Sequence, residues 1–126
     1  MLNKAQLIAF VAIQDSATSR RFYQQTLGLK LASEDHFAIV FDANGIMLRV
    51  QKVEKVKAGG YTALGWQVKD IRAEVRQLTK RGVSFERFDG MPQDEFGIWM
   101  SPADASIAWF KDPDGNILSL TQFGED

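Results

Sequence analysis

The sequence predicts an α+β domain of two tandem βαβββ modules, and an internal repeat is the main reason. In both halves, strand-like, helix-like and strand-like segments follow one another in the same order. Asp15 and Asp70 each follow a first strand with the same alternation of apolar residues, and the turns 42–45 and 112–115 each precede a last strand. Two unrelated halves would need all of these coincidences. Within the single domain 1–126, the first module, the linker and the second module are expected at residues 1–56, 57–62 and 63–126.

The first module reads as a strand, a helix and three further strands. Residues 7–14 carry the β-branched and aromatic residues typical of a strand. Either Asp15 or Ser16 is placed to cap a helix over 17–27, which Gly28 ends. The Asn44-Gly45 pair predicts a tight hairpin between the last two strands. The three later strands are expected over residues 29–33, 37–41 and 46–53.

The second module repeats this order from a strand over 63–68. Ile71, Val75 and Leu78 share one face of the helix that follows Asp70. The segment 89–106 is predicted to be a loop, and loops of that length are usually functional or mobile. The remaining strands are expected over residues 83–88, 107–110 and 117–122.

Composition excludes several classes of function. Fifteen Lys and Arg against sixteen Asp and Glu leave a net charge of −1, which provides no field to attract nucleic acid or an anionic membrane. No apolar run approaches the roughly 20 residues that span a bilayer, and no cleavable leader is evident, so we expect a cytoplasmic protein. The chain has no cysteine, and His36 is its only histidine, which excludes metal sites built from several histidines.

Two segments carry a resemblance to a known family. The opening AFVAIQDSATSRRFYQQTLGLKL and the closing WFKDPDGNILSLTQF, within two βαβββ modules, resemble the vicinal oxygen chelate superfamily, also called the glyoxalase/bleomycin resistance/dioxygenase superfamily. The resemblance covers nearly the whole chain. It implies a curved mixed sheet with a ligand cleft, and a homodimer.

The sequence departs from this family at the positions that hold a metal in its metal-using members. Those positions correspond to Ile8, Arg49, Ala63 and Ser119. A divalent cation needs lone pairs, which Ile8 and Ala63 lack, and Arg49 brings a positive charge. We therefore expect no metal and no cofactor, and no catalytic residue stands out. The chain is more similar to the metal-free binders of the superfamily, such as the bleomycin resistance proteins.

The side chains opposite the helices are the candidates for ligand binding, because alternate residues of a strand point to opposite faces. Arg49 suits a carboxylate, a phosphate or a planar acceptor; the alternative is an arginine at a strand edge that pairs with a nearby carboxylate. Trp99 suits stacking on an aromatic ligand, or else anchors its loop or a dimer contact. Trp66 and Trp109 are expected in the core. The candidate ligand-binding residues are Phe10, Met47, Arg49, Gln67, Trp99 and Ser119.

The favoured hypothesis is a metal-independent protein that binds a small anionic or aromatic molecule, with sequestration of an antibiotic or a metabolite as one role. The alternative is a glyoxalase-like or dioxygenase-like enzyme with a non-standard active site. Such an enzyme would use a metal held by carboxylates such as Glu54 or Asp104, or Arg49 to polarise a carbonyl. A third hypothesis has Phe10, Met47 and Trp99 filling the cleft, so that the protein acts through protein contacts.

Overall fold

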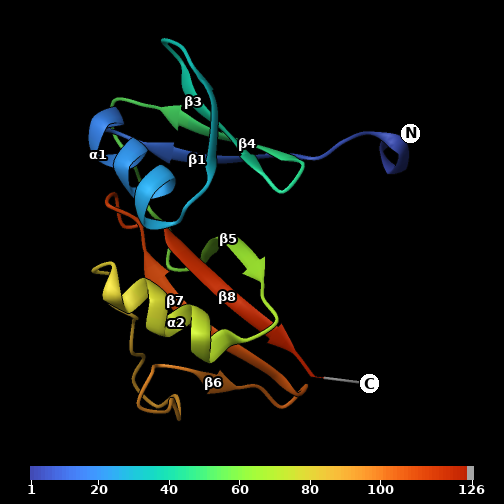
Figure 1. Ribbon diagram of the computed structural model, residues 1–126, viewed down its shortest axis with the longest axis vertical. Coiled ribbons are helices and arrows are strands. Elements are labelled where there is room, and N and C mark those ends of the chain that lie inside the picture. The colour runs from blue at the N-terminus through green and yellow to red at the C-terminus, as the bar shows by residue number, and fades with distance from the viewer. Residues whose placement is uncertain (125–126) are drawn as a thin grey trace. The chain divides into compact units, whose positions relative to one another are not determined.

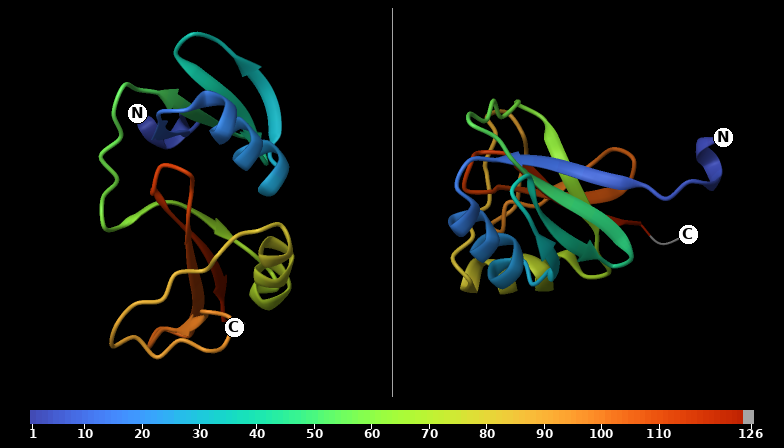
Figure 2. Two further views of the ribbon diagram at one scale, coloured as in Figure 1. Left: turned by 90° about the vertical axis from the view of Figure 1, so that its left-hand side faces the viewer. Right: turned by 90° about the horizontal axis from the view of Figure 1, so that it is seen from above.

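A computed structural model describes residues 1–124 of the chain. The chain divides into two compact units, Met1–Lys57 and Ala58–Asp126. Each unit contains one four-stranded mixed sheet and a helix that follows its first strand (Figures 1 and 2). The order β, α, β, β, β therefore occurs twice, as the repeat in the sequence predicts.

The first unit begins with a single helical turn, Leu2–Lys4, and its sheet has the strand order β1-β4-β3-β2. β1 runs parallel to β4, and the other neighbours are antiparallel. Of the two candidate caps, Asp15 caps α1: its side chain accepts a hydrogen bond from the Thr18 amide at 3.2 Å, and that bond lowers the pKa of the Asp15 carboxyl. The elements are β1 (Ile8–Ile13), α1 (Ser16–Arg21), β2 (Lys30–Glu34), β3 (Ala38–Ala43) and β4 (Ile46–Lys52).

The helix of the first unit changes its winding halfway. The α-helical hydrogen bonding expected over 17–27 ends at Arg21, and a π-helical turn, η2 (Phe22–Thr26), completes the element. In that turn the Leu27 amide donates to the Phe22 carbonyl, a bond across five residues. The side chain of Tyr23 is fully buried and lies 6.1 Å from the Phe41 ring, centroid to centroid. The turn thus supplies the large side chain that covers one face of the first sheet.

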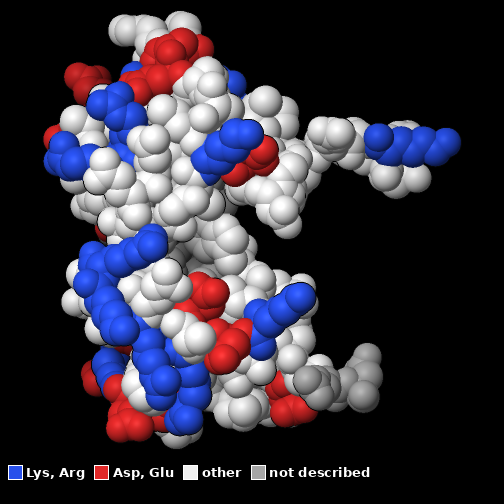
Figure 3. Space-filling model, viewed as in Figure 1, with Lys and Arg blue, Asp and Glu red and all other residues white. Residues whose placement is uncertain are grey.

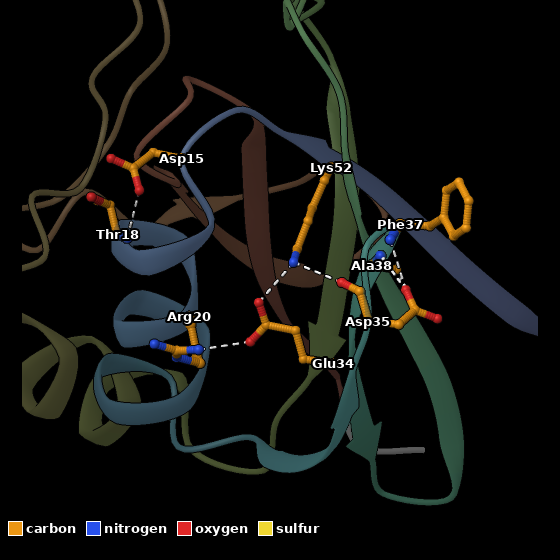
Figure 4. Close-up of polar contacts among 8 residues, drawn as sticks. All are labelled: Asp15, Thr18, Arg20, Glu34, Asp35, Phe37, Ala38 and Lys52. Atoms are coloured by element: carbon orange, nitrogen blue, oxygen red, sulfur yellow. Dashed lines mark hydrogen bonds and ion pairs between the residues drawn. The ribbon is translucent and has the colours of Figure 1, made fainter.

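Three polar side chains tie the elements of the first unit together (Figure 4). The Glu34 carboxylate on β2 accepts a hydrogen bond from Arg20 of α1 at 2.7 Å and another from Lys52 of β4 at 2.8 Å. Lys52 also donates to the Asp35 carbonyl at 2.7 Å. The hydrogen bonds from Lys52 and Arg20 lower the pKa of Glu34.

The second unit has the strand order β5-β8-β7-β6, with β5 parallel to β8. Asp70 caps α2 through a hydrogen bond from the Ala73 amide, and Ile71, Val75 and Leu78 are buried as expected. The elements are β5 (Thr62–Gln67), α2 (Ile71–Lys80), β6 (Trp99–Met100), β7 (Ala105–Lys111) and β8 (Ile117–Phe123).

The expected strand over 83–88 is wrong. That segment makes only an isolated bridge between Phe85 and Phe110, and the fourth strand of the sheet is β6, inside the predicted loop 89–106. Side-chain hydrogen bonds, rather than a ladder of main-chain bonds between strands, hold the loop that leads from this segment to β6. Arg87 donates to the carbonyls of Asp94 and Glu95, and Gln93 bonds main-chain groups on both sides of the loop.

The two turns that mark the repeat are present. Asn44 and Gly45 both have positive φ, 54° and 90°, as a tight hairpin of this type requires. At the second turn the buried Asp112 side chain accepts hydrogen bonds from the amides of Asp114 and Asn116, both at 2.9 Å.

In both sheets, the strand residues that face the helix are mostly apolar and buried, and they form the core of each unit. We call the opposite surface of each sheet its helix-free face. Within residues 1–124, no helix has the length and apolar character needed to cross a bilayer. In the view of Figure 3, acidic and basic side chains both occur on each unit.

Candidate functional site

The helix-free face of the first sheet brings three of the predicted residues together. The register places Phe10 of β1 directly opposite Arg49 of β4, and Ile8 opposite Met47. Paired residues of neighbouring strands point to the same face, so these four side chains form one patch. Ile8, Phe10 and Met47 are exposed, with Phe10 at 55%, and Arg49 is half-buried. We call these residues the Arg49 patch.

Arg49 stands in the middle of the sheet, because β4 lies between β1 and β3. An arginine on an edge strand, one alternative from the sequence, is therefore wrong. Within residues 1–57, the guanidinium of Arg49 makes no hydrogen bond or ion pair with another side chain. It acts at longer range: hydrogen bonds from the Phe37 and Ala38 amides lower the pKa of Asp35 most, and the charge of Arg49 lowers this pKa further.

An unpaired, half-buried guanidinium has a chemical consequence. It offers five N–H donors in a planar fork, and the apolar side chains around it weaken competition from water. Carboxylates, phosphates and phosphonates match this fork with two parallel hydrogen bonds. Met47 also borders a hollow of about 230 Å³ in the first unit, next to Val40 and Asp42. Arg49 does not line this hollow, so what the patch itself offers is a binding group for an anion and apolar surface beside it.

The helix-free face of the second sheet carries the other three predicted residues. Across this sheet, one row joins Gly65, Ser119 and Trp109, and the next row joins Gln67, Thr121, Ile107 and Trp99. Gln67, Ser119 and Trp99 therefore share one face, which the alternation in the sequence predicts for Gln67 and Ser119 but not for Trp99. Trp99 belongs to a strand and not to a loop.

Ser119 is less accessible than expected. It is only 7% exposed, and a β-carbon built on its neighbour Gly65 would lie 2.7 Å from the Ser119 oxygen. The absence of a side chain at Gly65 is what lets the Ser119 hydroxyl lie against the neighbouring strand. Gln67, by contrast, is exposed on the edge strand β5.

Trp109 differs from the expectation of a core residue. It is half-buried on the helix-free face, and its ring lies 6.1 Å from Trp99 and 5.4 Å from Phe88, centroid to centroid. Trp66 alternates with Gly65 and Gln67 and so points toward the helix side, as expected, although it too is only half-buried. A signal for this position is present in the sequence: Trp109 lies between the core residues Ala108 and Phe110, so strand alternation places its side chain on the opposite face.

The residues at the family's metal positions do not fit a divalent cation. Ile8 and Ala63 carry no donor atom, and Arg49 carries a positive charge in place of a carboxylate. Among residues 1–124, no group of three or more histidine, aspartate or glutamate side chains is arranged to hold a metal ion, and that search includes Glu54 and Asp104. His36 is exposed and packs edge-on against Phe37.

Comparisons with known proteins agree with the fold. The chain aligns with a crystal structure of a glyoxalase/bleomycin resistance protein/dioxygenase from Alicyclobacillus acidocaldarius at 19% identity and a TM-score of 0.71, covering 98% of this chain and 94% of that one. A glyoxalase family protein from Bacillus anthracis aligns at 16% identity and a TM-score of 0.73, covering 98% and 100%. The fosfomycin resistance protein FosX from Listeria monocytogenes aligns at 10% identity and a TM-score of 0.73, covering 96% and 94%.

A comparison with curated proteins found no significant match. A family model, however, matches residues 6–120, which include both modules. The match extends from the segment before β1 into β8, and so over both helix-free faces. The chain belongs to the Glyoxalase/Bleomycin resistance protein/Dioxygenase superfamily.

Proposed function

We propose that this protein binds a small anionic organic molecule without a metal ion, and that Arg49 holds the anionic group. The guanidinium of Arg49 on the inner strand β4 carries the proposal, because within residues 1–57 it makes no hydrogen bond or ion pair with another side chain. A half-buried charge without a partner is costly, and an anionic ligand offsets that cost through charge-assisted hydrogen bonds. Phe10, Met47 and Ile8 supply apolar contact for the body of the ligand.

The proposed role is to sequester or carry the ligand, an antibiotic or a metabolite, as a cytoplasmic homodimer. A binder needs complementary surface and no reacting group, and the patch contains neither a nucleophile nor a general base. The exposed apolar side chains of the first unit suit a contact with a ligand or with a second subunit. Because a structural neighbour is a fosfomycin resistance protein, fosfomycin is one of the ligands to be tested.

Binding is tested with a matched pair of variants. Thermal unfolding is followed with sodium benzoate, phenylphosphonate and fosfomycin, and with benzamide as an uncharged analogue. In Arg49→Met the side chain keeps its apolar stem and loses its charge. Arg21→Met, on an exposed position of α1, makes the same chemical change away from the patch.

We expect at least one anion to raise the melting temperature of the wild type and of Arg21→Met, and benzamide to have no effect. In Arg49→Met we expect affinity for that anion to fall about 10- to 100-fold, since hydrogen bonds to a charged group contribute roughly 1.5–3 kcal/mol. Equal stabilisation of both variants would contradict the role of Arg49. No stabilisation of the wild type by any of the three anions would contradict the proposal for these ligand classes.

The enzyme alternative makes a different prediction. Turnover of a glyoxalase or dioxygenase substrate that disappears in Arg49→Met and persists in Arg21→Met would assign Arg49 to electrophilic activation of a carbonyl. The binding proposal expects no product by chromatography after prolonged incubation. Turnover that needs an added divalent ion would contradict metal independence.

A further inference from the structure

The second unit contains an apolar hollow that the Arg49 patch does not share. Its volume is about 200 Å³, and Trp109, Phe88, Tyr61, Met91 and Ile117 contribute to its wall. Ile117 and Trp109 belong to β8 and β7 on the helix-free face, and the other three come from loops. We propose that this hollow is a second binding site, which takes one uncharged planar aromatic ring against Trp109.

The rings in the wall carry the argument. The Phe88 ring meets Trp109 nearly edge-on, at 5.4 Å and 89°, and the Trp99 ring is tilted by 34° against Trp109 at 6.1 Å. The Trp109 ring is thus flanked by Phe88 from the loop after residue 85 and by Trp99 from β6. Phe88 is 37% exposed and Tyr61 75% exposed, which leaves aromatic surface uncovered beside Trp109. Aromatic rings prefer such stacked or edge-on neighbours to water.

The size and polarity of the hollow select the ligand. An apolar protein cavity of about 150 Å³ is large enough to bind benzene, so about 200 Å³ suits one ring or two fused rings. None of the side chains that line the hollow is charged. An anion would therefore lose hydration here without gaining a partner, whereas a neutral ring gains stacking contact with the aromatic wall.

The proposal is independent of the proposed function. All the residues that line the hollow lie in the second unit, from Gly60 to Ile117, whereas Arg49 lies in the first. A ring-binding site therefore persists if Arg49 binds nothing. The proposal holds whether the ring and the anion belong to one ligand or to two different ligands.

Heteronuclear NMR of the full chain gives a direct readout, because each tryptophan contributes one indole N–H resonance and the chain has only Trp66, Trp99 and Trp109. The resonances are assigned with single Trp→Phe variants. Indole serves as the probe, with cyclohexylmethanol as a non-planar control of similar size and tetramethylammonium as a cationic one. We expect indole to shift the resonance of Trp109 in a saturable way and to leave that of Trp66, on the opposite face, nearly unchanged.

Phe88→Ala and Phe123→Ala form the matched pair of variants. Phe123 is also exposed, at 59%, and belongs to the same unit but not to the wall of the hollow. A ring contact contributes enough that removing Phe88 should weaken indole binding about 2- to 12-fold. Phe123→Ala should bind indole like the wild type.

Three results would overturn the proposal: indole that shifts Trp66 as much as Trp109, equal affinity in the two phenylalanine variants, or cyclohexylmethanol that binds as well as indole. Saturation by tetramethylammonium without indole would show a cation site instead. Arg49→Met separates the two proposals, because it should leave indole binding unchanged. Loss of indole binding in Arg49→Met would also contradict the independence of the hollow.

Discussion

Replacing Asp112 with alanine removes the side chain that organises the turn before β8. One carboxylate oxygen accepts hydrogen bonds from the amides of Asp114 and Asn116, both at 2.9 Å, and the other accepts from the Asn116 side-chain amide at 2.8 Å. Asp112 is 5% exposed, so water replaces these contacts poorly. The variant leaves three donors without their acceptor.

The expected loss of stability follows from these contacts. Hydrogen bonds to a charged acceptor contribute about 1.5–3 kcal/mol each, but three bonds that share one carboxylate do not contribute additively. We therefore expect Asp112→Ala to lower the free energy of unfolding by about 3 kcal/mol. With a urea dependence of about 2 kcal/mol per molar, the midpoint of unfolding falls by about 1.5 M.

A swap of two side chains tests the mechanism more sharply. Asp112→Asn places an amide against the Asn116 amide, and Asn116→Asp places two carboxylates together. The double variant restores one donor and one acceptor, so we expect it to be more stable than the sum of the single changes predicts, by about 1 kcal/mol or more. Urea unfolding followed by circular dichroism measures the stability of the wild type, the two single variants of the swap, the double variant and Asp112→Ala. Additive effects, or a midpoint shift below about 0.3 M for Asp112→Ala, would refute the reasoning.

Three further predictions concern the pH dependence of stability, the packing at Gly65, and the subunit number and metal content of the purified protein. Interactions with Lys52 and Arg20 hold the pKa of Glu34 below its ordinary 4.5. The ionised carboxylate therefore stabilises the fold above that pH, and the effect is lost as the pH falls through the lowered pKa. Glu34→Gln should flatten the pH dependence of the melting temperature below about pH 5. An unchanged slope would contradict this. Gly65→Ala should lower the melting temperature by several degrees, since its β-carbon meets the Ser119 oxygen, and adding Ser119→Ala should restore most of it. Native mass spectrometry of the purified protein should show a metal-free dimer; one divalent ion per subunit would contradict the assignment of Ile8 and Ala63.

Much of the fold could be predicted because its signals are local. A capping aspartate, an Asn-Gly turn and alternating apolar residues each act within a few residues, and all three lie where the sequence places them. The same alternation assigned Phe10 and Arg49 to one face. Their register partners then follow from the parallel pairing of β1 with β4.

The errors lie where distant contacts decide the conformation. Residues 83–88 have the composition of a strand, but the main chain at Glu86 bonds the Trp109 carbonyl only once before the loop turns away. Side-chain hydrogen bonds from Arg87 and Gln93 hold that loop, and the residue types of a segment do not predict such bonds. Trp99 pairs with Ile107 in the sheet for the same reason.

The sequence by itself therefore determined the repeat, the helices, the turns and the two faces of each sheet, because these depend on residue type and spacing along the chain. Tertiary structure alone decided that β4 is an inner strand, which leaves Arg49 amid apolar neighbours and, within the first unit, without a side chain that hydrogen-bonds or ion-pairs with it. It also brought Phe88, Trp99 and Trp109 together. Which strands become neighbours depends on hydrogen bonds and packing between residues far apart in the chain, and no local pattern encodes those contacts.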